Sequence, residues 1–263
     1  MVTIYDIAKK ANVSAMTVSR VINNSENISE QTRKKVEAII KEMNYIPNSS
    51  ARSLISKKSK ILSLMITDIS NPFFTSVARG AKDKAMQMGY QLLLCNSDES
   101  IEKESKYIDM LISTGSDGVL IAPASDASKK NIRKLAKHNI PFVLIDRDIK
   151  DLKCDQVLSD NEATTRKLIE HLIEQGHTKI SIINGPLDVA TSRERHQAYC
   201  DTLQLHGLTV NENWIHQSQL FQDSDVSSII KKLLDLPVNE RPTAIFATNN
   251  FLGLNTVKCL KKF

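Results

Sequence analysis

The segment T-I-Y-D-I-A-K-K-A-N-V-S-A-M-T-V-S-R-V-I-N, residues 3–23, decides the first domain of this 263-residue chain. Thr3 can cap a helix, and Asp6 follows three positions later, where its carboxylate can reach back to the free amides. The residues that form one apolar stripe at helical spacing are Ile4, Ile7, Ala8 and Ala11. The segment therefore predicts a first helix that begins after Thr3 and ends near Asn12.

A turn and a second helix are predicted next. Asn12 suits a left-handed stop, and Ser14 is a second N-cap. The second helix directs Val18, Val21 and Ile22 inward. The residues that are expected to face outward are Ala15, Met16, Thr17, Ser19, Arg20 and Asn23. Two short helices with one buried seam and a polar outer face predict a helix-turn-helix, which fits the major groove of DNA.

The same stretch resembles the N-terminus of the LacI/GalR family of bacterial transcriptional repressors. Three strings carry the resemblance: T-I-x-D-I-A at 3–8, A-x-V-S at 11–14 and T-V-S-R-V-I-N at 17–23. The resemblance implies a DNA-binding head over residues 1–46, completed by a third helix over 30–43. It also implies a two-lobed core like that of periplasmic sugar-binding proteins, and a homodimer that binds a pseudo-palindromic operator.

The outward residues suggest how such a head would bind double-stranded DNA. Arg20 is the expected base or phosphate contact, because arginine reads guanine through O6 and N7. Ala15 and Met16 begin the recognition helix and, being apolar, favour thymine methyl groups. The residues placed to contact phosphates, which fix register but not sequence, are Thr3, Tyr5, Thr17, Ser19 and Asn23.

Charge is distributed unevenly along the chain. Residues 1–60 contain 11 Lys/Arg and 5 Asp/Glu, whereas the remainder contains 24 and 25. A basic head on a near-neutral body indicates that the head binds a polyanion. A lysine-rich solvated face is the alternative, and the helix-turn-helix in the same segment favours DNA.

A hinge is predicted over residues 47–60. In N-Y-I-P-N-S-S-A-R-S-L, residues 44–54, Pro47 disfavours helix before it and permits a short helix after it. In the resembled family this is a hinge helix whose leucine enters the minor groove, and the matching residue is Leu54, with Ala51 one turn earlier. A plain linker is the alternative for this segment.

From Ile61 onward, the sequence predicts strands that alternate with helices. Predicted strands cover 61–68, 91–96, 118–122 and 141–146, alternating with helices over 71–88, 101–113 and 128–138. A second series has a short strand or crossover at 157–159, strands at 179–184 and 244–248, and helices at 160–175, 191–206, 223–234 and from 250 onward. This alternation predicts an α/β core of two lobes, 61–159 and 160–263, with parallel sheets covered by helices on both faces.

Ligands of such sheets bind beyond the carboxyl ends of the strands. Segments there that match the family's sugar-binding core are D-I-S-N-P-F-F (68–74), D-R-D (146–148), S-D-N (159–161), R-x-R-x-x-x-Y (193–199) and T-N-N (248–250). The resemblance implies an effector site that includes Ser70, Asn71, Phe73, Phe74, Asp146, Arg195 and Asn250. Arg195 matches the family arginine that reaches the effector, whereas Arg193 is expected to pack on the surface.

For some of these residues, a structural role is the alternative to effector binding. One of Phe73 and Phe74 is expected to fill the core, and Asp146 would also serve as a cap for the turn that follows it.

The chain departs from the family pattern in two ways. Asn249-Asn250 stand where the family usually has Asn-Asp, so an uncharged amide that can also donate replaces a carboxylate, and an acidic effector becomes a hypothesis. Family members also continue beyond the equivalent of Phe263 with a further strand and a segment that returns to the first lobe. The second sheet is therefore expected to have an open edge, in either a fragment or a natural truncation.

Other protein classes lack support in the sequence. There is no P-loop, no G-x-G-x-x-G after a strand, no G-x-S-x-G and no H-E-x-x-H, so we expect no enzyme, cofactor or metal site. The four cysteines form no C-x-x-C pair, which indicates reduced thiols. No apolar run approaches the ~18 residues of a membrane span. We therefore expect a cytoplasmic protein without a signal peptide.

The leading hypothesis is a sequence-specific transcriptional regulator of carbohydrate genes that responds to a sugar, sugar phosphate or sugar acid. The alternatives are a truncated DNA-binding remnant that does not respond to effector, and a small-molecule binding protein without DNA activity.

Overall fold

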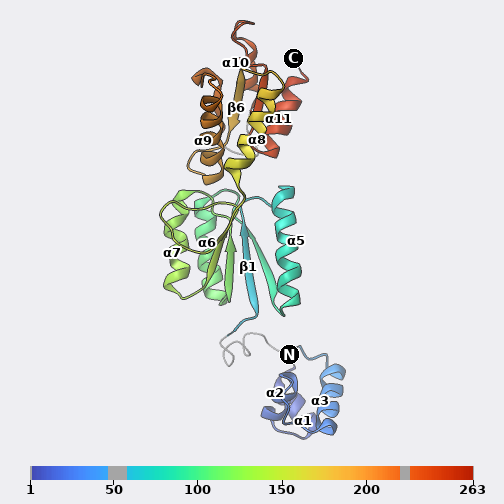
Figure 1. Cartoon of the computed structure of the whole chain (residues 1–263). Coiled ribbons are helices and arrows are strands. Elements are labelled where there is room, and N and C mark those ends of the chain that lie inside the picture. The colour runs from blue at the N-terminus through green and yellow to red at the C-terminus, as the bar shows by residue number, and fades with distance from the viewer. Residues whose placement is uncertain (1, 47–57, 220–225, 263) are drawn as a thin grey trace. The chain divides into compact units, whose positions relative to one another are not determined.

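The computed structural model describes residues 2–46, 58–219 and 226–262. The chain divides into two compact units, residues 1–59 and 60–263 (Figure 1). The predicted hinge residues Ala51 and Leu54 lie outside the described residues.

The first unit contains the three predicted helices, α1 (Ile4–Ala11), α2 (Ala15–Ile22) and α3 (Glu30–Glu42). Its buried apolar core consists of Ile7, Ala8, Ala11, Val18, Val21 and Val36. Ala15 was predicted to face outward, but it is half-buried and packs against this core. The reason is its position at the start of α2, beside the turn.

Local hydrogen bonds set the ends of α1 and α2. The Thr3 N–H donates to Asp6 Oδ2 at 2.8 Å, and the Asp6 N–H donates to Thr3 Oγ1 at 3.4 Å, which confirms the predicted reciprocal cap. Asn12 ends α1 with a φ of 52°, in the left-handed region. Ser14 then caps α2, its Oγ accepting from the Thr17 N–H at 3.1 Å. Each contact joins residues that are three positions apart, so the sequence could predict them.

The second unit begins with a five-stranded parallel sheet of order β2-β1-β3-β4-β5. Its strands are β1 (Ile61–Ile66), β2 (Gln91–Asn96), β3 (Gly118–Ile121), β4 (Phe142–Ile145) and β5 (Gln156–Val157). Helix α5 (Pro72–Gln87) covers one face, and α6 (Ile101–Thr114) and α7 (Lys129–Lys137) cover the other (Figure 1). A short 3-10 turn, Asp126–Ser128, precedes α7.

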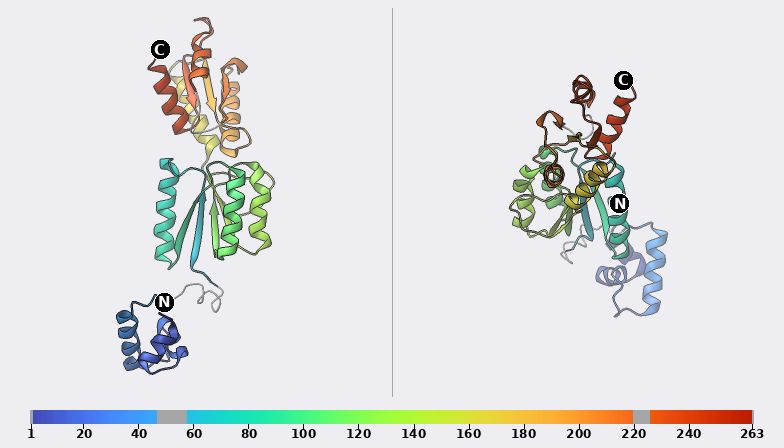
Figure 2. Two further views of the ribbon diagram at one scale, coloured as in Figure 1. Left: turned by 180° about the vertical axis from the view of Figure 1, so that it is seen from behind. Right: turned by 45° about the horizontal axis from the view of Figure 1, so that its top comes forward.

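A second parallel sheet follows, with the order β7-β6-β8. Its strands are β6 (Ile180–Asn184), β7 (Ile215–Gln217) and β8 (Ala244–Ala247). Helices α8 (Asn161–Glu174) and α9 (Ala190–Leu205) pack on one face, and α10 (Val226–Leu234) and α11 (Asn250–Leu260) pack on the other. Figure 2 shows these helices from two further directions.

The strand β7 was missed by the sequence analysis. It is only three residues long and follows a single 3-10 turn at Glu212–Trp214, so its hydrophobic pattern is too short to separate it from a loop. Tertiary contacts hold it in place: Trp214 is buried, and its carbonyl accepts a 2.7 Å hydrogen bond from Ser181 Oγ on β6.

Replacing the cap of α2 is expected to destabilise the head. Ser14→Ala removes the acceptor for the Thr17 N–H, and a lost N-cap costs about 1 kcal/mol. Amide hydrogen exchange in α2 should accelerate by roughly fivefold relative to the wild type. Ser14→Asp restores a capping oxygen and should return most of the protection. Equal exchange in Ser14→Ala and the wild type would contradict the assigned cap.

Candidate functional site

The head exposes much of the predicted DNA-binding set. Tyr5 is 73% exposed and Met16 is 64% exposed, and Thr3, Arg20 and Asn23 are also exposed. Thr17 and Ser19 are half-buried. Because Val18 and Val21 occupy the buried side of α2, Met16 and Arg20 lie on its outer side. This is the arrangement that a groove-binding helix requires.

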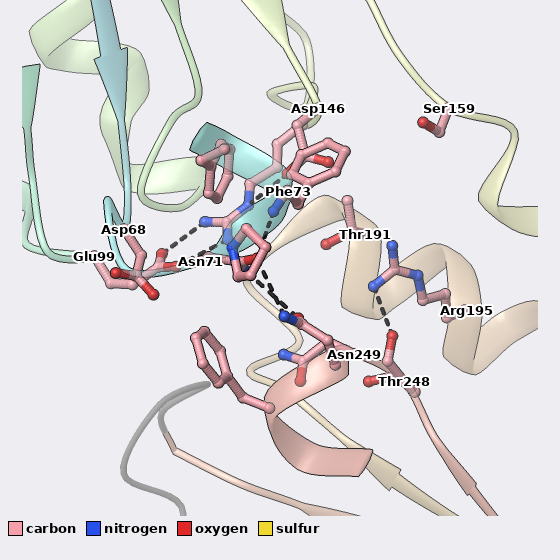
Figure 3. A pocket seen from close by; sticks show the side chains of 15 residues that line it. Asp68, Asn71, Phe73, Glu99, Asp146, Ser159, Thr191, Arg195, Thr248 and Asn249 are labelled. Carbon is pink, nitrogen blue, oxygen red and sulfur yellow. Dashed lines mark hydrogen bonds and ion pairs between the residues drawn. The ribbon is translucent and has the colours of Figure 1, made fainter. Parts of the chain in front are cut away.

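The second unit contains a cavity of about 430 Å³ that residues of both lobes line (Figure 3). The loops that follow β1, β2 and β4 contribute from the first lobe, and α9 and the turn into α11 contribute from the second. The lining residues are Asp68, Asn71, Pro72, Phe73, Phe74, Glu99, Asp146, Arg147, Ser159, Thr191, Arg195, Thr248, Asn249, Asn250 and Phe251. The cavity therefore lies beyond the carboxyl ends of the strands, as predicted.

Arg147 holds the first-lobe wall of the cavity together. Its guanidinium forms a bidentate ion pair with Glu99. Nη1 donates to Oε2 at 2.6 Å, and Nη2 donates to Oε1 at 2.9 Å. It also donates to the carbonyls of Pro123 and Ala124, at 3.2 Å and 3.3 Å. Burial lowers the pKa of Arg147, but the pairs with Glu99 and Asp146 outweigh that effect and raise it. This arginine therefore stays charged and links the loops after β2, β3 and β4.

Asp146 directly follows β4 and has a φ of 65°, in the left-handed region that an aspartate tolerates. Its Oδ2 lies 3.5 Å from Arg147 Nε. Burial raises the pKa of Asp146, and the positive charges of Arg147 and Arg195 oppose that rise. The carboxyl group is thus a partly desolvated acceptor at the cavity wall.

Arg195 enters the cavity from α9 and is held by neutral acceptors. Its Nε and Nη2 donate to Asn161 Oδ1 at 3.1 Å and 2.8 Å, and its Nη1 donates to the Thr248 carbonyl at 2.8 Å. Burial lowers its pKa, whereas the negative charge of Asp146 raises it. In the part of the chain that the structure describes, no carboxylate lies within ion-pair distance of this guanidinium.

Two further buried polar atoms line the cavity without a hydrogen-bond partner among the described residues: Asp68 Oδ2 and Thr248 Oγ1. Buried polar groups normally have partners. Together with the remaining N–H groups of Arg195, these atoms suit a ligand that both donates and accepts hydrogen bonds.

Asn71 and Asn250 bond to each other across the cavity. The Nδ2 of Asn250 donates to Asn71 Oδ1 at 3.2 Å, and the reverse contact measures 3.5 Å. Asn71 Oδ1 also caps α5 by accepting from the Phe73 N–H at 3.0 Å. Phe74 is 3% exposed and fills the core, whereas Phe73 is 45% exposed, which confirms that one of the two rings is structural.

Two expectations about this region differ from the structure. Ser70 does not line the cavity, because its N–H and its hydroxyl both donate to Asp68 Oδ1 at 2.8 Å. Arg193 does not simply pack on the surface: it pairs with Asp126 at 2.9 Å and lies 3.9 Å from Asp148, which connects α9 to loops of the first lobe.

Some of the residues that line the cavity were not predicted individually from the sequence. Asp68, Arg147, Ser159, Thr248 and Asn249 lie within the quoted segments, so their positions after strands were the available signal. Glu99 lies outside every quoted segment. Only its position three residues after β2 pointed to it.

Comparison with known proteins identifies the family. Residues 3–48 match the family of bacterial regulatory proteins of the lacI type. Residues 58–262 match the family of periplasmic binding proteins and the sugar-binding domain of the LacI family. The chain belongs to the LacI family.

Relatives of this LacI-family chain are regulators. It is 38% identical over 254 residues to the probable HTH-type transcriptional regulator EndR of Paenibacillus polymyxa, covering 95% of this chain and 73% of EndR. It is 33% identical over 263 residues to the HTH-type transcriptional repressor PurR of Aliivibrio salmonicida, covering 100% of this chain and 78% of PurR.

Solved structures agree with the family. The Lac repressor dimer bound to operator and the anti-inducer ONPF is similar with a TM-score of 0.81 and 25% identity, over 99% of this chain and 78% of that chain. The complex of the transcriptional regulator CelR with cellobiose is similar with a TM-score of 0.68 and 27% identity, over 100% and 78%. These similarities span the head and the core of the LacI-family chain.

The described ranges of this LacI-family chain are residues 2–46, 58–219 and 226–262. No helix there is long and apolar enough to cross a membrane. No group of three or more His, Cys, Asp or Glu residues there is arranged to hold a metal ion.

The raised pKa of Asp146 predicts how its removal changes stability with pH. The folded state of this LacI-family chain keeps the Asp146 proton to higher pH than the unfolded state does. Ionisation of this residue therefore lowers the free energy of unfolding as pH rises from the ordinary pKa of 3.8 through the folded pKa. Asp146→Asn removes this loss, so the variant should gain stability relative to the wild type as pH rises.

Urea unfolding between pH 4 and pH 7, followed by circular dichroism, measures this difference. Asp151→Asn is the matched control, because Asp151 is exposed and has a similar φ of 58°. If the stability of Asp146→Asn relative to the wild type instead fell as pH rose, the carboxylate would be favoured in the folded state, against the prediction.

Proposed function

We propose that this chain is a sequence-specific DNA-binding transcriptional regulator, a repressor of carbohydrate-utilisation genes. It binds a pseudo-palindromic operator as a homodimer and responds to a small sugar-like effector in the cavity between the lobes. The observation that carries the proposal is the head: a capped helix-turn-helix whose second helix buries Val18 and Val21 and exposes Met16 and Arg20.

DNA binding by the head follows from charge and geometry. Arg20 is exposed, and its guanidinium makes no ion pair with any residue that the structure describes. An unpaired arginine on a recognition helix is suited to guanine or to phosphate. A single head reads only a few base pairs, so two copies on a two-fold symmetric site supply the required length.

The lining of the cavity supports effector binding. Arg195, Asp68 and Thr248 present hydrogen-bonding atoms that no residue of the described ranges satisfies, and the exposed ring of Phe73 suits the apolar face of a sugar. The effector residues of the proposal are Asn71, Phe73, Phe74, Asp146, Arg195 and Asn250, with Ser70 acting through Asp68. Arg195 has no carboxylate partner among the described residues and Asn250 is uncharged, which supports a sugar acid or sugar phosphate as the effector.

Substitution of Arg20 tests the DNA contact. Arg20→Ala should weaken specific operator binding by about 1–3 kcal/mol, because one arginine–guanine contact is lost. Arg20→Lys keeps the positive charge without the planar fork, so it should retain non-specific binding and lose part of the specific binding. Fluorescence anisotropy on operator and on scrambled DNA separates the two effects. Unchanged operator affinity in Arg20→Ala would remove Arg20 from the interface.

Substitution of Asn250 tests the charge of the effector. A panel of neutral sugars, sugar phosphates and sugar acids is titrated against the operator complex of the wild type and of Asn250→Asp. With an anionic effector, the added carboxylate should weaken the response by about tenfold through like-charge repulsion. Ser113→Asp, on an exposed serine outside the cavity, adds the same charge as a control. A screen in which only neutral sugars bind would count against the acidic effector.

The same anisotropy experiment distinguishes the alternatives. Tight, salt-sensitive binding that an effector changes supports the regulator. Salt-sensitive binding that no effector changes supports a DNA-binding remnant. Effector binding without salt-dependent DNA binding supports a small-molecule binding protein.

A further inference from the structure

Helix α7 of the first lobe carries a row of positive charges and no negative one. Its sequence, K-K-N-I-R-K-L-A-K, contains five Lys or Arg among nine residues. Ile132 and Leu135 are buried in the core of the first lobe, so the opposite side of the helix faces outward. The exposed cations on that side, called here the outer cations, are Lys130, Arg133 and Lys137.

The other two cations of α7 have partners within the lobe. Lys134 Nζ pairs with Asp109 Oδ1 of α6 at 2.7 Å, and Lys129 Nζ donates to the Lys150 carbonyl at 3.0 Å. On the neighbouring α6, both lysines pair with nearby carboxylates. The outer cations, by contrast, form no ion pair with any residue that the structure describes. Their charge is therefore available to a partner.

The arrangement of these charges does not stabilise the helix. Like charges four residues apart repel each other, and α7 contains three such pairs: Lys129 with Arg133, Lys130 with Lys134, and Arg133 with Lys137. Lys129 and Lys130 also occupy the first turn, where the helix dipole disfavours positive charge. A bound polyanion would remove this repulsion.

The geometry of the outer cations suits a phosphate backbone. Their spacing of three and four residues places them on one side of the helix. At about 1.5 Å per residue they cover about 10.5 Å of the helix axis. One strand of DNA presents a phosphate about every 3.4 Å along its axis, so this length faces several phosphates. A basic row along one helix is typical of nucleic-acid binding.

The position of α7 in the fold favours DNA over an acidic protein as the polyanion. Helix α7 precedes β4, so its end at Lys137 lies toward the edge at which the parallel strands of the first sheet begin (Figure 1). Strand β1 begins at the same edge, and the chain from the head enters there, just before Lys60. DNA bound by the head is therefore tethered to this edge, which raises its effective concentration there.

We propose that the outer face of α7 is a second DNA-binding surface, at which Lys130, Arg133 and Lys137 contact the phosphate backbone of the duplex that the head binds. This inference rests on the proposed DNA-binding function and adds a surface outside the head. Phosphate contacts carry no base information, so this surface strengthens binding to the operator and to other sequences alike.

The salt dependence of DNA binding tests the proposal. The α7 variant is Lys130→Gln/Arg133→Gln/Lys137→Gln in the full 263-residue chain. Kd is measured by anisotropy over a range of salt concentrations, on a duplex selected from random DNA and on a scrambled duplex. The slope of log K against log salt should become shallower by about 2–3 for each bound chain, because each phosphate contact contributes about 0.9. The ratio of the two affinities should change by less than about twofold.

A matched control separates contact from net charge. Arg166→Gln/Lys167→Gln/Lys231→Gln also removes three exposed cations, which lie on α8 and α10 of the second lobe. Both variants change the net charge of the chain equally. The slope of the control variant should differ from that of the wild type by less than about 0.5, because its cations contact no phosphate. Circular dichroism checks that both variants are folded.

Three results overturn the inference while leaving the proposed function intact: an unchanged slope in the α7 variant, an equal loss in the control variant, or a loss confined to the selected sequence. An unchanged DNA slope together with binding of polyglutamate that only the α7 variant loses would assign the face to an acidic protein instead. A wild-type chain without salt-sensitive DNA binding would overturn both the inference and the proposed function.

Discussion

A buried guanidinium holds together the part of this protein that faces the cavity. Arg147 is 5% exposed and contacts Glu99 after β2, the carbonyls of Pro123 and Ala124 after β3, and Asp146 beside it after β4. Removing one partner of a buried ion pair costs about 3–5 kcal/mol, because the remaining charge is left desolvated. The three loops therefore form one rigid wall, and the left-handed Asp146 is held in place within it.

On the second-lobe side of the cavity, the arginine is held by hydrogen bonds to neutral groups. Its cation, Arg195, is fixed by neutral oxygens from Asn161 and Thr248 rather than by a carboxylate. One arginine of the cavity is thus paired with carboxylates, whereas the other makes its hydrogen bonds to neutral oxygens. The Asn71–Asn250 contact joins the lobes at this cavity, and the Arg193–Asp126 ion pair joins them outside the cavity lining. A bound ligand would therefore compete with or reinforce contacts that join the lobes.

Particular residues show where sequence reasoning succeeds in this fold. The reciprocal cap of Thr3 and Asp6, the left-handed Asn12 and the capping Ser14 were all predictable, because each interaction spans at most a few positions. The alternation of strands and helices predicted parallel sheets with both faces covered, since hydrophobic period and length identify each element. Strand β7 was not predicted, because three residues are too few to show a hydrophobic period.

What the sequence determined by itself is therefore the helix-turn-helix, the α/β alternation, the family and the segments that end at the cavity. The tertiary structure alone decided which members of those segments line the cavity. It turned Ser70 toward Asp68, drew Arg193 into an ion pair with Asp126, and brought Glu99 to Arg147 across 48 positions of sequence. The physical reason is that caps and periodicity act between near neighbours, whereas the partner of a buried charge is chosen by how separate strands pack together.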